Sequence, residues 1–188
     1  MRCTPRQTLP AFSALTVLAL QTALVYIPGC SATPNPSDAP DAAVQPTARD
    51  DFLGHLVGDW HITRRMQSRT VENTMSARWV LGGMFVQMHM IDVARPPKYE
   101  AIVLVGHDPQ RDRYVAYWCD SFGPGYSAEG IGVRHGDTVE FTFQYENGPF
   151  VNTFAWHDAD RTWTFRGENV SPSGEHVFFM EDTATASR

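Results

Sequence analysis

The stretch TVEFTFQYENGPFVNTFAWH, residues 138–157, decides the fold class. Apolar residues occupy every second position of Val139–Tyr145, and polar residues lie between them. A period of two returns in Phe150–Trp156, after the turn dipeptide Asn147-Gly148. This period is typical of strands that bury one face, and Asn-Gly between two such runs favours a tight hairpin. The stretch therefore predicts two antiparallel strands with a shared apolar face.

Most of the chain on either side of this hairpin also consists of short strand-like runs with a period of two. Turn signals separate the runs about every 8–12 residues, and only Asp51–Val57 has the spacing of a helical turn. The other runs are Trp60–Met66, Thr74–Leu81, Met84–Val93, Tyr99–Gly106, Arg113–Phe122, Ser127–Arg134, Thr162–Val170 and Glu175–Thr183. Short loops without crossover helices favour antiparallel up-and-down order, and closure removes exposed strand edges. We expect an all-β fold, a single antiparallel up-and-down barrel of about eight to ten strands; a β-sandwich is the alternative, because its strand spacing is similar.

Composition narrows the class of protein. The chain has 188 residues, which suits one domain, with 15 Lys and Arg against 21 Asp and Glu and a net charge of −6. Nucleic-acid partners are not expected, since binding phosphates normally needs a basic face. Aromatic residues make up 12% of the chain, enough to fill a core or to line a cavity.

The beginning of the chain predicts an export signal. Arg2 and Arg6 precede the apolar run Ala11–Tyr26, which is shorter than the roughly 20 residues of a spanning helix. We therefore expect a signal peptide over residues 1–29, a Pro- and Ala-rich linker over residues 30–50 and the barrel domain over residues 51–188. A permanent membrane anchor or a buried core helix is the alternative for the apolar run.

The sequence Ile27-Pro28-Gly29-Cys30 at the end of this segment resembles the bacterial lipobox. The resemblance implies cleavage before Cys30 and a lipid on its sulfur, so that acyl chains hold the protein on a membrane surface. Ser31 then implies the outer membrane, facing the periplasm. Plain secretion is the alternative. Cys119 is left as a single thiol in the barrel domain, so we expect no intramolecular disulfide.

Short motifs along the domain also resemble known families. Gly58-Asp59-Trp60 is similar to the opening signature of lipocalins and other calycin barrels, in which the Trp closes one end. Trp79-Val80-Leu81-Gly82-Gly83 resembles a segment of the bacterial "domain of unknown function" family fifteen seventy-nine, which is regarded as lipocalin-like. Further matches lie at Gly106-His107-Asp108, Arg113-Tyr114 and Trp118-Cys119-Asp120. The resemblance covers roughly Phe52 to Asp182 and implies a barrel, with no established reaction.

Candidate ligand-binding residues come from the aromatic and polar positions of the predicted strands. Trp60, Trp79, Trp118 and Trp156 are candidates to line a cavity for a small apolar ligand, and a packed core is the alternative for each. Among polar residues the candidates are Arg78, Gln87, His89 and Asp120, which lie within apolar runs. An inward-facing Arg–carboxylate pair would anchor a ligand head group. The alternative, slightly favoured for Gln87 and His89, is a solvated outer face opposite the Met84–Met90 stripe.

The sequence contains no strong motif for catalysis. Sequence motifs of serine hydrolases, zinc proteases, P-loop proteins and dinucleotide-binding proteins are absent, so catalytic residues stay unassigned and enzyme activity uncertain. No metal and no cofactor is expected; haem is a minor alternative through His176, because haem-binding barrels of the nitrobindin type use a late His. The leading hypothesis is a membrane-tethered carrier of a small apolar molecule. The alternatives are an enzyme with an enclosed substrate and an envelope interaction protein without a pocket.

Overall fold

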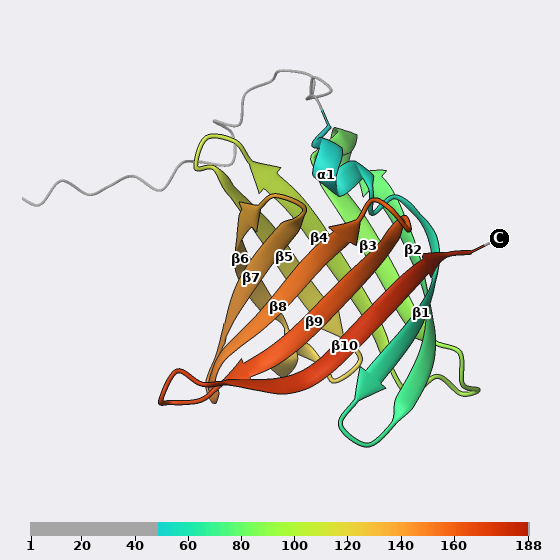
Figure 1. Cartoon of the computed structure of the whole chain (residues 1–188), viewed down its shortest axis with the longest axis vertical. Helices are drawn as coiled ribbons and strands as arrows, with labels where there is room; N and C mark the ends of the chain where they lie inside the picture. Colours follow the sequence, from blue (N-terminus) through green and yellow to red (C-terminus); the bar gives the residue numbers. More distant parts are fainter. Residues whose placement is uncertain (1–48, 188) are drawn as a thin grey trace, which may run out of the picture. The chain divides into compact units, whose positions relative to one another are not determined.

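The computed structural model describes residues 49–187. Ten antiparallel strands form one closed barrel, in which each strand pairs with its sequence neighbours and the first pairs with the last (Figure 1). The strands are β1 (Gly58–Met66), β2 (Thr70–Val80), β3 (Phe85–Asp92), β4 (Glu100–Asp108), β5 (Arg113–Asp120), β6 (Ala128–His135), β7 (Thr138–Tyr145), β8 (Gly148–His157), β9 (Thr162–Val170) and β10 (His176–Ala186). The predicted all-β, up-and-down barrel is confirmed.

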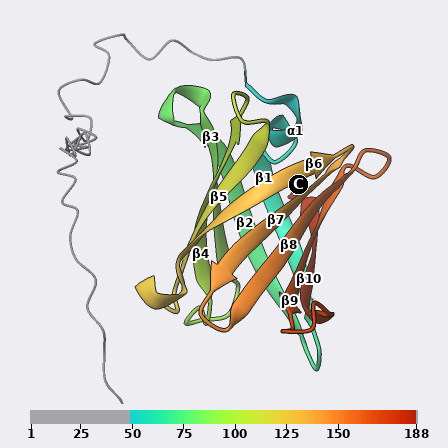
Figure 2. The same ribbon diagram turned by 90° about the vertical axis from the view of Figure 1, so that its left-hand side faces the viewer.

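Closure of the barrel depends on the pairing of β1 with β10. The register runs from Trp60 opposite Ala186 to Met66 opposite Met180. Closure leaves no free edge, so every strand has two neighbours (Figure 2). The sandwich alternative is therefore excluded.

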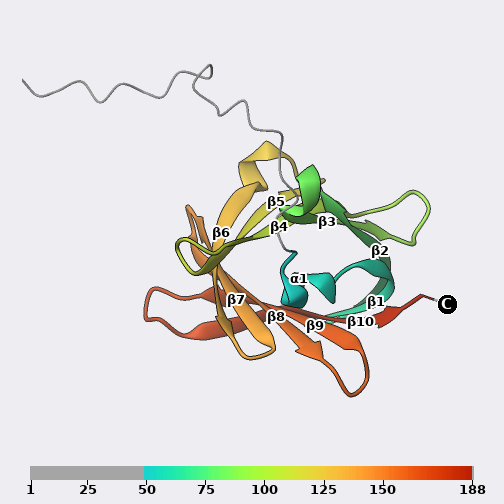
Figure 3. The ribbon, with the colours of Figure 1, turned by 90° about the horizontal axis from the view of Figure 1, so that it is seen from above.

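A short helix, α1 (Asp51–Gly54), covers one end of the barrel and lies within the ring of strands when seen from above (Figure 3). Asp50 caps it, because its Oδ1 accepts a hydrogen bond from the Leu53 N–H at 2.8 Å. Phe52 and Leu53 of the helix, and Leu56 just after it, are almost completely buried. The predicted helical turn at Asp51–Val57 is present, and its apolar face closes the barrel end.

Inward-facing positions follow the period of two. The core holds the apolar faces of the strands, including Val86, Met88 and Met90 of β3 and Val139, Phe141 and Phe143 of β7. Large rings fit because β6 contributes glycines: a Cβ at Gly130 would lie 2.6 Å from the Phe143 ring. The structure thus combines small residues on one strand with aromatic rings on the next.

The predicted signal peptide, Cys30 and most of the predicted linker lie outside the described residues. Within residues 49–187, no helix has the length and apolar character to cross a bilayer. Five hairpin loops surround the end opposite α1. We call the interior near α1 the α1 half, and the interior toward these loops the far half.

Candidate functional site

The α1 half is a packed aromatic core that contains two of the predicted ligand-binding residues. Trp60 and Trp156 lie there with their ring centroids 6.4 Å apart, and Trp156 lies 5.3 Å from Trp163. The Trp60 Nε1–H donates to the Leu56 carbonyl at 2.8 Å, which ties the strand to the segment after α1. Phe52 completes the group with an edge-on contact to Trp163 at 5.2 Å. These rings fill the end of the barrel.

Trp79 lies at the margin of this half, beside a hollow of about 280 Å³ that is also lined by Leu53, Met84 and His107. The Arg49 guanidinium lies 5.6 Å from the centre of the Trp79 ring. In the wall of the hollow, Asp50 Oδ2 is 3.3 Å from the His107 Nδ1 and accepts a hydrogen bond from the Tyr114 hydroxyl at 2.9 Å. These contacts fasten α1 to β4 and β5.

Arg78, Gln87 and His89 do not line the interior, so they are corrected as candidates for ligand binding; for Gln87 and His89 this agrees with the outer-face alternative that the sequence slightly favoured. Arg78 forms a two-pronged contact with Asp59 on the outer surface, at 2.7 and 2.8 Å. Gln87 and His89 alternate with the buried methionines of β3 and face outward, where the His89 Nε2 contacts Glu100 at 2.6 Å. The physical reason is the register of β3: a strand buries one of its two faces, and here the Met face is the core.

Trp118 and Asp120 lie on the inward face of β5 in the far half. Trp118 packs against the core and makes an edge-on contact with Phe143 at 6.2 Å. Asp120 accepts a hydrogen bond from the Phe122 N–H at 3.0 Å, and its charge reaches Tyr99 and Tyr145. The structure therefore brings these two candidates together, and separates them from Trp60 and Trp156.

The strongest polar interaction in the far half joins Arg64 of β1 to Asp182 of β10. The guanidinium donates two hydrogen bonds of 2.7 Å, from Nε and Nη2, to the two carboxylate oxygens. Asp182 is completely buried, and Arg64 is 9% exposed. Burial works against the charge on Arg64, but the hydrogen bonds and charge of Asp182 outweigh it, so the pKa of Arg64 lies above its usual value.

Two asparagines complete the polar part of the far half. Asn73 of β2 and Asn152 of β8 are each 1% exposed. The structure described gives no hydrogen-bond partner to the Asn73 Oδ1 and Nδ2 or to the Asn152 Oδ1. Buried polar atoms in proteins almost always have a partner, because leaving one unpaired costs about 1–3 kcal/mol. These side chains therefore require an explanation.

Tyr99 links this interior to the loops at the far end. The centre of its ring lies 4.9 Å from the Arg64 guanidinium and 5.8 Å from the centre of the Phe122 ring. A hollow of about 300 Å³ opens at the rim, lined by Tyr99, Phe122, Lys98 and neighbouring residues. Burial raises the pKa of Tyr99, and Asp120 adds to the effect. The hydroxyl thus remains protonated at neutral pH.

Tyr145 lies on the same face of β7 as Phe143, and the two rings stack with centroids 6.5 Å apart. Burial raises the pKa of Tyr145, again with a contribution from Asp120. The far half can consequently present neutral hydroxyls, amides and one neutralised ion pair within aromatic walls. This combination suits the orientation of a small molecule that is mostly apolar.

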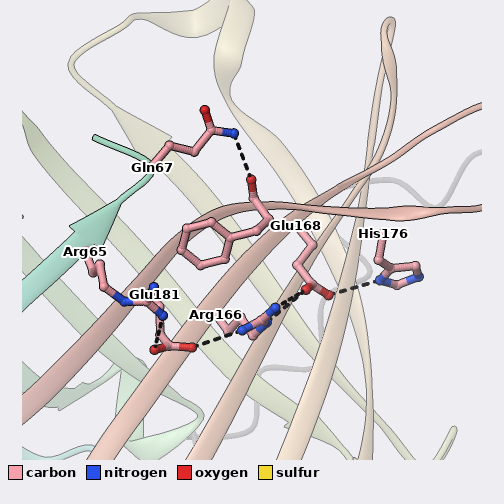
Figure 4. Close-up of polar contacts among 7 residues, drawn as sticks. Arg65, Gln67, Arg166, Glu168, His176 and Glu181 are labelled. Atoms are coloured by element: carbon pink, nitrogen blue, oxygen red, sulfur yellow. Dashed lines mark hydrogen bonds and ion pairs between the residues drawn. The ribbon is translucent and has the colours of Figure 1, made fainter. Parts of the chain in front are cut away.

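A separate charged network lies across β1, β9 and β10 (Figure 4). Glu181 accepts from Arg65 at 2.8 Å and from Arg166 at 3.1 Å, and Arg166 also bonds to Glu168 at 2.8 Å. The Nδ1 of His176 lies 3.1 Å from Glu168. His176 is therefore part of an exposed ionic network rather than of the interior.

The residues do not fit a haem held by histidine inside the barrel. All seven histidines of the sequence lie within the described residues, and each is at least partly exposed. Within residues 49–187, no group of three or more His, Cys, Asp or Glu side chains has an arrangement that could hold a metal ion.

The sequence analysis missed Arg64, Asn73, Tyr99, Tyr145, Asn152 and Asp182. Most of them carry a common signal, which is a polar side chain at an inward position of a strand. Arg64 follows Trp60 and Ile62 on one face, and Asp182 lies between Met180 and Ala184. A search for interruptions of the apolar face would have found these residues.

A comparison with solved structures finds one chain of similar fold. "Crystal Structure of Rv2717c from M. tuberculosis" aligns with a TM-score of 0.52 at 11% identity, and covers 75% of this chain and 100% of that one. A redesigned β-barrel aligns with a TM-score of 0.35 at 12% identity, covering 76% and 100%. The comparison with curated proteins gives no match. Residues 45–185 match the family described as "Protein of unknown function (DUF1579)", and the chain belongs to that family.

Proposed function

We propose that this protein binds a small, mostly apolar molecule in the far half of its barrel. The observation that carries the proposal is the contrast within one interior. The α1 half is filled by aromatic rings, whereas the far half places Arg64, Asp182, Asn73 and Asn152 at inward positions. Polar groups inside an apolar tube cost free energy unless they are paired, so their presence favours a binding role.

The location of the hollow at the rim supports this proposal. It lies between the loop before β4 and the loop after β5, and Tyr99 separates it from the buried Arg64–Asp182 pair. Trp118 and Phe143 pack edge to face within the same half of the barrel. A molecule at this position would place its apolar part against the aromatic rings and its polar part toward the asparagines and the ion pair.

The place of action in the cell is also a proposal. We infer that the chain is exported and held at the outer membrane by a lipid on Cys30, facing the periplasm. The support is the basic start, the apolar run and the lipobox-like Ile27-Pro28-Gly29-Cys30. Labelling of the full chain with a radioactive fatty acid tests this: the wild type should incorporate it, and a Cys30→Ala variant should not.

The binding function is tested by mass spectrometry of small molecules extracted from the full-length protein after purification from its own envelope. We expect a defined molecule in stoichiometric amount. A Trp118→Arg variant, which adds a charge to this half of the barrel, should lose it, whereas Arg78→Gln on the outer surface should retain it. Absence of any molecule from wild-type protein, together with no binding of added apolar probes, would favour an interaction protein instead.

A second candidate function, acid–base catalysis, has one specific observation in its favour. In the hollow at the α1 end, Asp50 contacts the His107 Nδ1, an arrangement that orients an imidazole for proton transfer. His107→Gln should abolish turnover of any substrate found for this site. It should leave ligand binding in the far half unchanged, which separates the two functions.

A further inference from the structure

We propose that the end of the barrel opposite α1 binds to the surface of a membrane that contains anionic phospholipids. The contact is made by three hairpin loops at that end, residues 67–69, 93–99 and 121–127, which we call the basic rim (Figure 1). The inference goes beyond ligand binding, because it concerns the outer tips of the loops and does not require a molecule in the interior. It rests on exposed aromatic side chains that lie beside cations without a carboxylate partner.

Large apolar side chains are exposed at the tips of the basic rim. Phe122 and Tyr126 are 64% and 60% exposed, and Val93 is 43% exposed. The Phe122 ring contacts the Tyr126 ring with centroids 6.0 Å apart, and it contacts the Tyr99 ring at 5.8 Å. The three aromatic rings therefore form one continuous patch that joins two of the loops. Grouped and exposed apolar side chains mark a contact with a partner or a membrane.

The loop that carries Phe122 and Tyr126 is held in place by its own hydrogen bonds. The Asp120 carboxylate accepts from the Phe122 N–H at 3.0 Å, and the Gly123 carbonyl accepts from the Tyr126 N–H at 3.0 Å. Gly123 has a φ of 101°, which residues with a side chain rarely adopt. The folded loop itself thus directs both rings toward solvent.

The charges of the basic rim have one sign. Its three loops contain Arg69, Arg95 and Lys98 and no Asp or Glu, although the whole chain has a net charge of −6. All three cations are exposed, and none of them forms an ion pair within residues 49–187. The Arg95 guanidinium contacts only backbone carbonyls of its own loop. These cations are therefore available to phosphate groups at a membrane surface.

The carboxylates that flank these loops lie at their base or on the barrel wall. Asp92 is only 4% exposed, and it accepts hydrogen bonds from the Ala94 and Lys98 N–H groups. Glu100 contacts His89 on the outer wall. Because these acids balance part of the positive charge, we expect the aromatic rings to contribute most of the membrane affinity. The cations then contribute the preference for anionic lipid.

The α1 end has the opposite charge. Its four hairpin loops, residues 81–84, 109–112, 136–137 and 158–161, contain four Asp and two Arg. Anionic headgroups repel an acidic end and attract a basic one. Aromatic and basic side chains on one face are also the combination with which proteins rest on a membrane surface without crossing it. Charge complementarity therefore favours a lipid surface as the partner and the basic rim as the end that contacts it.

The test introduces a tryptophan at one end or the other of the full-length protein, as Phe122→Trp in the basic rim or as Leu81→Trp at the α1 end. Leu81 is 63% exposed, so it is a matched control for Phe122. Each variant is mixed with vesicles of equal parts phosphatidylethanolamine and phosphatidylglycerol with brominated acyl chains, which quench tryptophan at short range. Phe122→Trp should show more quenching than the wild type, and Leu81→Trp should not. Any attachment through the beginning of the chain is common to both variants.

A second set of variants tests the cations. In the Phe122→Trp protein, the changes Arg95→Gln and Lys98→Gln together should lower the added quenching about twofold or more, because each cation near an anionic surface favours binding. The changes Arg111→Gln and Arg161→Gln at the α1 end remove the same charge and should leave the added quenching as it was. Thermal unfolding checks that every variant is folded.

Three results would overturn the proposal or part of it. Quenching in Leu81→Trp that equals or exceeds that in Phe122→Trp would place the membrane at the α1 end. Absence of added quenching in both variants would exclude a lipid surface as the partner and would favour a protein at the aromatic patch. Equal effects of the two pairs of charge changes would exclude a specific role of the basic rim's cations.

Discussion

The two halves of the barrel interior are filled by different kinds of side chain. Around α1, Phe52 packs edge to face against Trp163, Trp163 packs at a tilt against Trp156, and the fully buried side chains there are apolar. In the far half, the Arg64–Asp182 pair and two asparagines occupy inward positions among aromatic rings. The strands are continuous through both halves, so the difference comes from side chains alone. It teaches that one continuous barrel can be filled by apolar rings at one end and can bury polar side chains at the other.

The largest expected effect is on stability and comes from a substitution in the α1 half. Replacement of the buried ring in Phe52→Ala should lower the free energy of unfolding by about 3–5 kcal/mol, because it leaves a cavity beneath the helix. Chemical denaturation measures this. Phe122→Ala, which removes a ring that is 64% exposed, should change it by less than about 0.5 kcal/mol. Equal losses in the two variants would contradict the division into halves.

The next effect concerns the buried ion pair. Arg64→Met alone should cost about 3–5 kcal/mol, because it leaves the fully buried Asp182 carboxylate without its partner. The double variant Arg64→Met with Asp182→Leu should recover most of that loss, since two apolar side chains can pack in place of the pair. Its stability comes from denaturation curves and its ligand affinity from calorimetry. Recovery of stability without recovery of binding would show that the pair serves recognition. A double variant as unstable as the single one would mean that the pair is structural.

A smaller effect should appear at alkaline pH. Burial raises the pKa of Tyr99 and Tyr145 above the ordinary value of 10.0. Above that pH the unfolded chain releases protons that the folded protein retains, so the free energy of unfolding should fall as pH rises past 10. Denaturation between pH 9 and pH 11 tests this against the variant with Tyr99→Phe and Tyr145→Phe. If the free energy of unfolding fell as steeply with pH in the double variant as in the wild type, the role of these hydroxyls would be contradicted.

The smallest effect is expected on the outer surface. Arg166→Ala removes contacts with Glu168 and Glu181, but its side chain is 43% exposed, so the loss should stay below about 1 kcal/mol (Figure 4). The hydrogen bonds from Arg65 and Arg166 lower the pKa of Glu181, so its contribution is present above pH 4.5 and is lost as pH falls below it. Thermal unfolding at low and high salt measures the effect. A loss as large as that of Arg64→Met would show that surface charge holds the barrel together.

The barrel was predictable from the sequence because its signal is repeated in every strand. The spans Thr138–Tyr145 and Thr162–Val170 coincide with β7 and β9, and the other strands differ by a few residues at their ends. The largest difference is at β2, which begins at Thr70 rather than at Thr74. The polar Asn73 lies at an inward position there, so the apolar pattern is interrupted.

The candidate site was predictable only in part, because the pattern within one strand does not show which residues of distant strands come together. Trp118 and Asp120 stand out because they sit in an apolar run on one strand. The Arg64–Asp182 pair joins residues that are 118 positions apart, and only the closure of β1 on β10 brings them together. Gln87 and His89 illustrate the converse: a polar pair in an apolar run indicates a site only when that face is inward. The period of two does not say which face of β3 is buried.

The central claim, that a ligand occupies the far half, is tested most directly by quenching of tryptophan fluorescence with 4-bromobenzamide, whose bromine quenches only at short range. In the full-length protein, Trp118 should give most of the quenching. The Trp118→Phe variant should therefore lose most of the quenched amplitude, and Trp156→Phe in the α1 half should keep it. Quenching that survives in Trp118→Phe and disappears in Trp156→Phe would contradict the account and place the ligand at the other end of the barrel.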